Sequence, residues 1–96
     1  MTANKKKILI VDDDGALRLS LAEQLQLLEE FATVEAETAA QALEATKETY
    51  FDCILLDVAL PDMDGRDLCR VLRANGVRSP VIMLTAAGRG SDTIRG

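Results

Sequence analysis

Three short apolar runs of this 96-residue sequence each contain or precede a side chain that can do chemistry. Two of the runs lead to carboxylates, which can bind a hard divalent cation or act as nucleophiles. The third run leads to a hydroxyl, which can donate a hydrogen bond to an anion. The candidate residues are Asp12 and Asp13 after the first run, Asp57 within the second and Thr85 after the third.

The apolar runs have the length and composition of strands that are buried on both faces of a sheet. They span residues 8–11, 51–60 and 81–84. A weaker strand pattern covers residues 31–36, where Glu35 interrupts the apolar side chains. We therefore predict four strands.

Helical patterns separate the predicted strands. Residues 16–28 carry leucines every three or four positions, which predicts an amphipathic helix that packs through Leu17, Leu21, Leu25 and Leu28. Thr38 followed by Gln41 forms a capping box, which predicts a helix that ends near Lys47. A third helical pattern follows the acidic loop after Asp57, and Gly76 is typical of its C-terminal cap.

Strands that alternate with helices predict βαβ units and a parallel sheet. In such open sheets the reactive groups gather at the carboxyl ends of the strands. The four candidate residues all fall at that edge, although they come from three separate strands. We therefore expect them to lie close together.

Composition limits the classes of function. Ninety-six residues, 48% of them hydrophobic, are enough for one domain, which we assign to residues 1–96. The net charge is −5 and no basic tract is longer than residues 5–7, which argues against nucleic acid as a direct partner of this segment. No stretch reaches the roughly 18 apolar residues of a membrane span, and we expect a cytoplasmic protein without membrane contact. Cys53 and Cys69 form no CxxC pair and histidine is absent from the sequence, so we interpret both as buried thiols of a reducing compartment.

The segments ILIVDDD, LLDVALPDMDG and VIMLTAA, in this order and spacing, resemble the receiver domain of bacterial response regulators. The resemblance covers most of the chain, from Lys7 to Gly96. It implies an α/β fold of the flavodoxin-like type, in which a doubly wound parallel sheet has the strand order 2-1-3-4 and the fifth strand and fifth helix of the family are missing.

The same resemblance implies a role for each candidate residue. Asp57 would be the phosphoacceptor, and Asp12 and Asp13 would be the acidic pair that holds a divalent ion, Mg²⁺ or Mn²⁺. The backbone carbonyl of Ala59 would be a further metal ligand. Thr85 would supply the hydroxyl that senses the phosphoryl group.

A receiver domain takes its phosphoryl group from a sensor histidine kinase and relays the signal by a conformational change. The resemblance therefore implies a kinase partner and an effector or output domain, which the sequence does not identify. It also implies a protein that assists its own phosphorylation and dephosphorylation and is not a turnover enzyme.

The resemblance departs from the family pattern at its end. The fifth strand of the family begins with a lysine that contacts the phosphoryl group, and no residue of this sequence can be given that role. A sheet that ends with its fourth strand has an open edge, and we expect that a dimer can form through it.

Three alternative interpretations remain. The chain could be a pseudo-receiver, an interaction fragment that is not phosphorylated. It could be a metal-dependent phosphatase with an aspartyl nucleophile, although such enzymes usually carry a second acid where this sequence has Ala59. Finally, residues 12–14 could serve only to cap the helix that follows, with Asp14 as the cap itself.

Overall fold

The computed structural model of the chain describes residues 5–84, so Thr85 lies outside the described residues. Strands and helices alternate along this part of the chain, as the apolar and helical patterns predict. The elements are β1 (Lys6–Val11), α1 (Gly15–Leu27), β2 (Phe31–Ala36), α2 (Ala39–Glu48), β3 (Cys53–Asp57), α3 (Gly65–Ala74) and β4 (Val81–Leu84).

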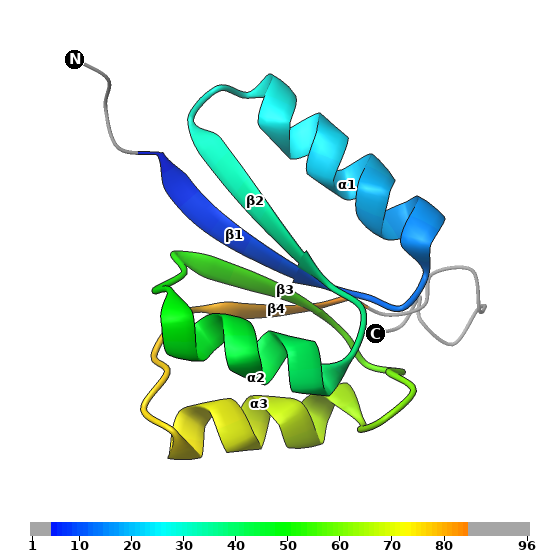
Figure 1. The fold of residues 1–96 in the computed structure, drawn as a ribbon, viewed down its shortest axis with the longest axis vertical. Coiled ribbons are helices and arrows are strands. Elements are labelled where there is room, and N and C mark those ends of the chain that lie inside the picture. Colours follow the sequence, from blue (N-terminus) through cyan, green and yellow to red (C-terminus); the bar gives the residue numbers. More distant parts are fainter. Residues whose placement is uncertain (1–4, 85–96) are drawn as a thin grey trace.

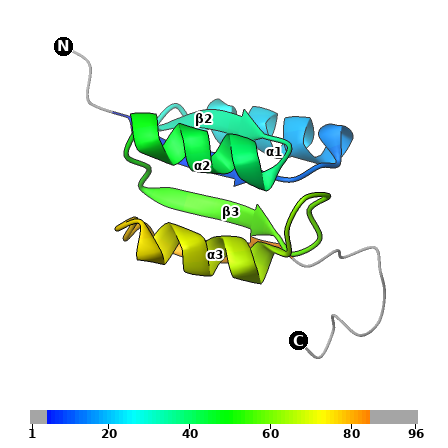
Figure 2. The same ribbon diagram turned by 60° about the horizontal axis from the view of Figure 1, so that its bottom comes forward.

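The four strands form one parallel sheet in the order β2-β1-β3-β4. This confirms the predicted α/β fold and strand order. Helices α2 and α3 cover one face of the sheet and α1 covers the other (Figure 1). Turning the molecule brings α2 and α3 in front of the strands and leaves α1 behind them (Figure 2). The chain is therefore doubly wound, and the strands all end at the same edge of the sheet.

The two faces of the sheet are packed to different extents. The face under α2 and α3 holds the larger core, which includes Leu9, Ile54 and Leu72 with no exposed surface. The face under α1 holds a smaller cluster of buried residues, namely Ile8, Ile10 and Ala22. Ile82 of β4 is 53% exposed. The prediction that every apolar strand is buried on both faces is thus fulfilled by β1 and only partly by β3 and β4.

Helix α1 forms where the leucine pattern predicts it, but it packs through a different residue. Ala22 is the buried residue of the helix, whereas Leu21 and Leu25 are only partly buried. The prediction of packing by leucine is therefore wrong for Leu17 and Leu28, which are exposed. Leucine periodicity identifies the apolar side of a helix, but a small side chain at the point of closest approach lets the helix lie near the sheet.

The predicted caps are confirmed in α1 and α2. The Asp14 side chain caps α1 and accepts a hydrogen bond from the N–H of Leu17 at 3.1 Å. The Thr38 hydroxyl caps α2 and accepts from the N–H of Gln41, also at 3.1 Å. The Gln41 side chain in turn accepts from the N–H of Glu37 at 2.7 Å, one residue before the cap.

The turns that lead from helix into strand lie at the opposite edge of the sheet from the strand ends. After α3, Gly76 has a φ of 90°, a left-handed conformation that suits glycine at the end of a helix. In the same turn the buried Ser79 hydroxyl donates to the carbonyl of Phe51 at 2.6 Å. Within residues 5–84, no helix is both long enough and apolar enough to cross a membrane.

Candidate functional site: an acidic cluster at the carboxyl ends of the strands

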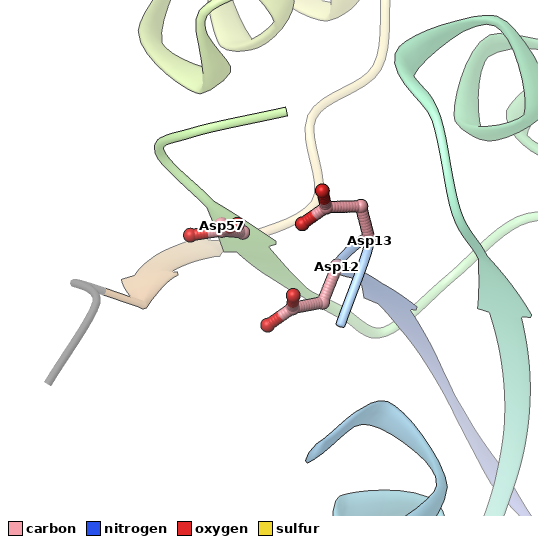
Figure 3. Close-up of side chains that lie close together, drawn as sticks. All are labelled: Asp12, Asp13 and Asp57. Carbon is pink, nitrogen blue, oxygen red and sulfur yellow. The ribbon is translucent and has the colours of Figure 1, made fainter. Parts of the chain in front are cut away.

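Three of the four candidate residues lie together. The carboxylates of Asp12, Asp13 and Asp57 each place an oxygen within 4.8 Å of the others. Figure 3 shows the three side chains at the ends of β1 and β3. The fourth candidate, Thr85, lies outside the described residues, and the structure does not test its role.

The pairing of β1 with β3 explains why these carboxylates meet. The two strands are parallel neighbours, with Val11 in register with Leu56. The residue after each of these positions is an aspartate, so Asp12 and Asp57 leave the same edge of the sheet side by side. Asp12 is 3% exposed and Asp57 is 7% exposed, whereas Asp13 is exposed. The cluster therefore combines two buried carboxylates with one that faces solvent.

The turn from β1 into α1 is fixed by hydrogen bonds around Asp12. Its N–H donates to the carbonyl of Ala36 in β2 at 3.0 Å. Its carboxylate accepts from the N–H of Asp14 at 2.9 Å. Its carbonyl accepts from Nη1 of Arg18 at 2.6 Å. Both the backbone and the side chain of Asp12 are thus held in place.

The loop after Asp57 folds back on itself. The N–H of Gly65 donates to the carbonyl of Val58 at 2.7 Å, and Ala59 forms an antiparallel bridge with Asp64. A Cβ atom at Gly65 would overlap the carbonyl oxygen of Asp57, so the close approach requires glycine. The exposed Ala59 therefore lies two residues beyond Asp57 on a closed loop.

A second anchor joins this loop to the start of α2. The two carboxylate oxygens of Asp62 accept hydrogen bonds from the N–H groups of Ala39 at 2.8 Å and Ala40 at 3.1 Å. These N–H groups belong to the first turn of α2 and have no partner within the helix. The Asp62 side chain, from the loop after β3, thereby provides acceptors for two N–H groups at the start of α2.

The buried carboxylates are harder to ionise than usual. Burial raises the pKa of Asp57, and the charges of Asp12 and Asp13 raise it further, while the N–H of Ala59 acts in the opposite direction. Burial also raises the pKa of Asp12, against the effect of its bond from Asp14. Mutual repulsion alone predicts this direction, but removal from water is the larger cause.

The donor set fits a hard divalent cation. Carboxylate oxygens are the ligands that Mg²⁺ and Mn²⁺ prefer in proteins. Asp12, Asp13 and Asp57 supply three such groups within reach of one another, two of them with raised pKa values. A bound cation would favour the ionised forms of these carboxylates and so offset the burial that opposes them.

Arg18 and Asp62 are the residues of this region that the sequence does not predict. A short acid in a loop beside Pro61 is typical of a side chain that accepts backbone N–H groups. The sequence gives no sign that those groups would belong to α2. In the same way, Glu35 disturbs the apolar pattern of β2, and only the structure shows that it pairs with Arg18.

Residues 8–96 match the family model described as the response regulator receiver domain. Over 100 residues the chain is 44% identical to the DNA-binding response regulator MtrA of Mycobacterium tuberculosis, with 100% of this chain and 41% of that protein covered. Over 93 residues it is 39% identical to the transcriptional regulatory protein ResD of Bacillus subtilis, with 97% of this chain and 38% of that protein covered. The chain thus spans about two fifths of the length of these curated relatives.

Solved structures give the same result. The signal receiver domain of the response regulator NarL from Mycobacterium tuberculosis matches 96% of this chain with a TM-score of 0.82 and 28% identity, and 73% of that domain is covered. The response regulator TrrA from Thermotoga maritima, in complex with Mg²⁺ and BeF, matches 84% of this chain with a TM-score of 0.77 and 32% identity, and 70% of it is covered. With the family model matched over residues 8–96, the chain belongs to the response regulator receiver domain family.

Proposed function

We propose that this chain accepts a phosphoryl group on Asp57 from a sensor histidine kinase, with Mg²⁺ or Mn²⁺ held by the acidic cluster. The single observation that carries the proposal is the meeting of Asp12, Asp13 and Asp57 at one edge of the sheet. Two of these carboxylates are buried with raised pKa values, an arrangement that costs stability and that a structural role does not require.

Transfer requires an ionised carboxylate that is aimed at the phosphorus atom. An oxygen of Asp57 forms the new P–O bond while the P–N bond to the donor histidine breaks, and the departing imidazole takes up a proton. Because little covalent chemistry is left to the protein, its contribution is positioning and charge neutralisation. Asp57 suits this role because it ends β3, and the closed loop fixes the backbone on its other side.

Asp12, Asp13 and Asp57, with the carbonyl of Ala59, would hold the divalent ion. When bound, this ion neutralises the negative charge that the phosphoryl oxygens bring into an acidic site. Thr85 would donate its hydroxyl to the phosphorylated product, which carries about 1.5 to 2 negative charges. The chain is then an acceptor that is consumed and regenerated and not a turnover enzyme.

The names of the relatives raise the question of whether this segment binds DNA. The relatives that are named as DNA-binding or transcriptional regulators are more than twice as long as the stretch that this chain matches. We therefore infer that the chain supplies the phosphoacceptor function of a signalling protein and that this segment does not itself bind DNA. Its net charge of −5 supports this inference.

The intact mass of the chain after incubation with Mg²⁺ and acetyl phosphate tests the proposal. We expect one phosphoryl adduct on the parent and none on Asp57→Asn. Asp67→Asn is the matched control, because Asp67 is an exposed acid of α3 paired with Arg70 and outside the cluster. An adduct on Asp57→Asn would show that another residue accepts the phosphoryl group. A folded parent without an adduct would favour an interaction module that is never phosphorylated.

A further inference from the structure

The guanidinium of Arg18 contacts three separate groups around the acidic cluster. Its Nη1 donates to the carbonyl of Asp12 at 2.6 Å. Its Nε lies 2.9 Å from Oε1 of Glu35, and its Nη2 lies 3.4 Å from Oε2 of Glu37. The Arg18 side chain is only 12% exposed. One side chain on the first turns of α1 therefore joins the turn after β1 to the end of β2.

These contacts fix the direction of the guanidinium. Two carboxylates hold one planar group by hydrogen bonds that involve charge on both partners, which are stronger than neutral ones. The remaining nitrogen then points at the Asp12 carbonyl. Because Asp12 and Asp13 are consecutive, a fixed carbonyl at Asp12 also limits where the carboxylate of Asp13 can lie.

We propose that Arg18 is a positioning residue for the acidic cluster, which acts by holding the turn that carries Asp12 and Asp13 against β2. This inference rests on the proposed function, since it gives Arg18 a role in cation binding. It extends that function to a residue outside the proposed ligand set.

Two effects of Arg18 on cation binding oppose each other. As a positive charge near Asp12, it repels a cation, so its removal would tighten binding. As an anchor of the turn, it lowers the cost of arranging the ligands, so its removal would weaken binding. The bond to the Asp12 carbonyl is direct and short, at 2.6 Å, so we expect the positioning effect to be the larger of the two.

Calorimetric titration of the metal-free chain with Mg²⁺ separates the two effects. Arg18→Lys keeps the charge but lacks the planar fork that can bond the carbonyl and both carboxylates at once. We expect Arg18→Ala to bind Mg²⁺ about ten-fold more weakly than the parent, as is usual for the loss of a residue that orients metal ligands, and Arg18→Lys to lose most of the same affinity. Arg70→Ala and Arg70→Lys are the matched controls, because Arg70 is an exposed arginine that pairs with Asp67 on α3. They should bind as the parent does.

Binding of Mg²⁺ by Arg18→Lys at the affinity of the parent, or more tightly, would overturn the proposal. If Arg18→Ala does not fold, Arg18→Lys decides alone. If the folded parent binds no Mg²⁺, the proposed function fails, and hydrogen exchange in the metal-free chain decides the role of Arg18. Faster exchange of the Asp14 amide, which bonds the Asp12 carboxylate, in Arg18→Lys than in the parent would support it. Unchanged exchange would refute it.

Discussion

At the scale of single residues, the ionised form of Asp57 that the proposed chemistry requires is also the form that destabilises the fold. In the proposed phosphoryl transfer its carboxylate must be ionised to attack phosphorus, yet burial and two neighbouring carboxylates raise its pKa in the folded chain. Between its unfolded and its folded pKa, the folded state binds more protons than the unfolded state. The stability that this protonation contributes is present at low pH and is lost as the pH rises through the folded pKa. At neutral pH without metal, the ionised cluster therefore destabilises the fold.

Asp57→Asn should therefore raise the melting temperature of the metal-free chain at pH 7. Asparagine keeps the shape of the side chain and removes one charge from the cluster. A gain of about 1 kcal/mol would shift the melting temperature by roughly 4–8 °C in a domain of this size. The shift should shrink as the pH is lowered, because the parent then protonates Asp57. Thermal melts at pH 7 and at mildly acidic pH, with EDTA present and Asp67→Asn as control, measure it. A variant that melts lower than the parent at pH 7 would contradict this account.

How far the sequence predicts the site depends on whether a residue's position follows from the strand pattern. Asp12, Asp13 and Asp57 are predictable because each follows or ends an apolar strand, and parallel strands end at one edge. Arg18 and Asp62 act through partners that lie 17 and 23 residues away. No local pattern specifies such pairs, since they depend on how α1 and the loop after β3 dock on β2 and α2.

At the scale of elements, helix α2 is held at its start from two directions. Thr38, the residue directly before α2, caps the helix as the sequence predicts. Asp62 comes from the loop after β3 and accepts hydrogen bonds from the first N–H groups of the helix. The backbone N–H groups of Ala39 and Ala40 lower the pKa of Asp62, with Ala39 as the larger cause. Asp62 therefore contributes stability above its unfolded pKa, and this contribution is lost as the pH falls through the lower, folded value.

The two caps should respond differently to pH. Thr38→Ala should cost about 1 kcal/mol at every pH, because a hydroxyl does not titrate in this range. Asp62→Asn should lower the melting temperature at neutral pH, and the difference from the parent should diminish in acid, where the parent's carboxylate becomes protonated. Melting curves at pH 7 and pH ~3 compare them. A deficit of Asp62→Asn that does not change with pH would show that charge is not the source of its effect.

Helix α1 marks the limit of prediction at this scale. Its position follows from the leucine pattern, and its N-cap follows from Asp14. The leucine pattern does not predict which residue the helix buries, because periodicity cannot distinguish a side chain that faces the sheet from one beside it. Ala22 is buried, and Leu17 is 44% exposed.

At the scale of the whole molecule, the sheet is unevenly covered. The face under α2 and α3 carries the larger core, and the face under α1 leaves Ile82 of β4 53% exposed. Within residues 5–84, β4 has a hydrogen-bonded neighbour, β3, on one side only. An edge strand with an apolar exposed side chain favours association with a second copy.

The 96-residue chain should therefore self-associate, and Ile82→Asp should reduce the association. Sedimentation velocity over a range of concentrations measures the change in average mass. Tyr50→Asp is the control, because Tyr50 is a 69% exposed aromatic residue in the turn before the central strand β3 and not on β4. A parent that stays monomeric at every concentration, or an equal effect of both variants, would rule out an interface at β4.

The parallel sheet also places the acidic cluster and the turns from helix to strand at opposite ends of its strands. The turns at residues 28–30, 49–52 and 75–80 precede strands, whereas Asp57 ends β3 and Asp12 and Asp13 follow β1. A fluorophore attached at Tyr50 would thus sit a full strand length away from the carboxylates. Such a label could report on the protein's motions while leaving its acidic groups chemically untouched.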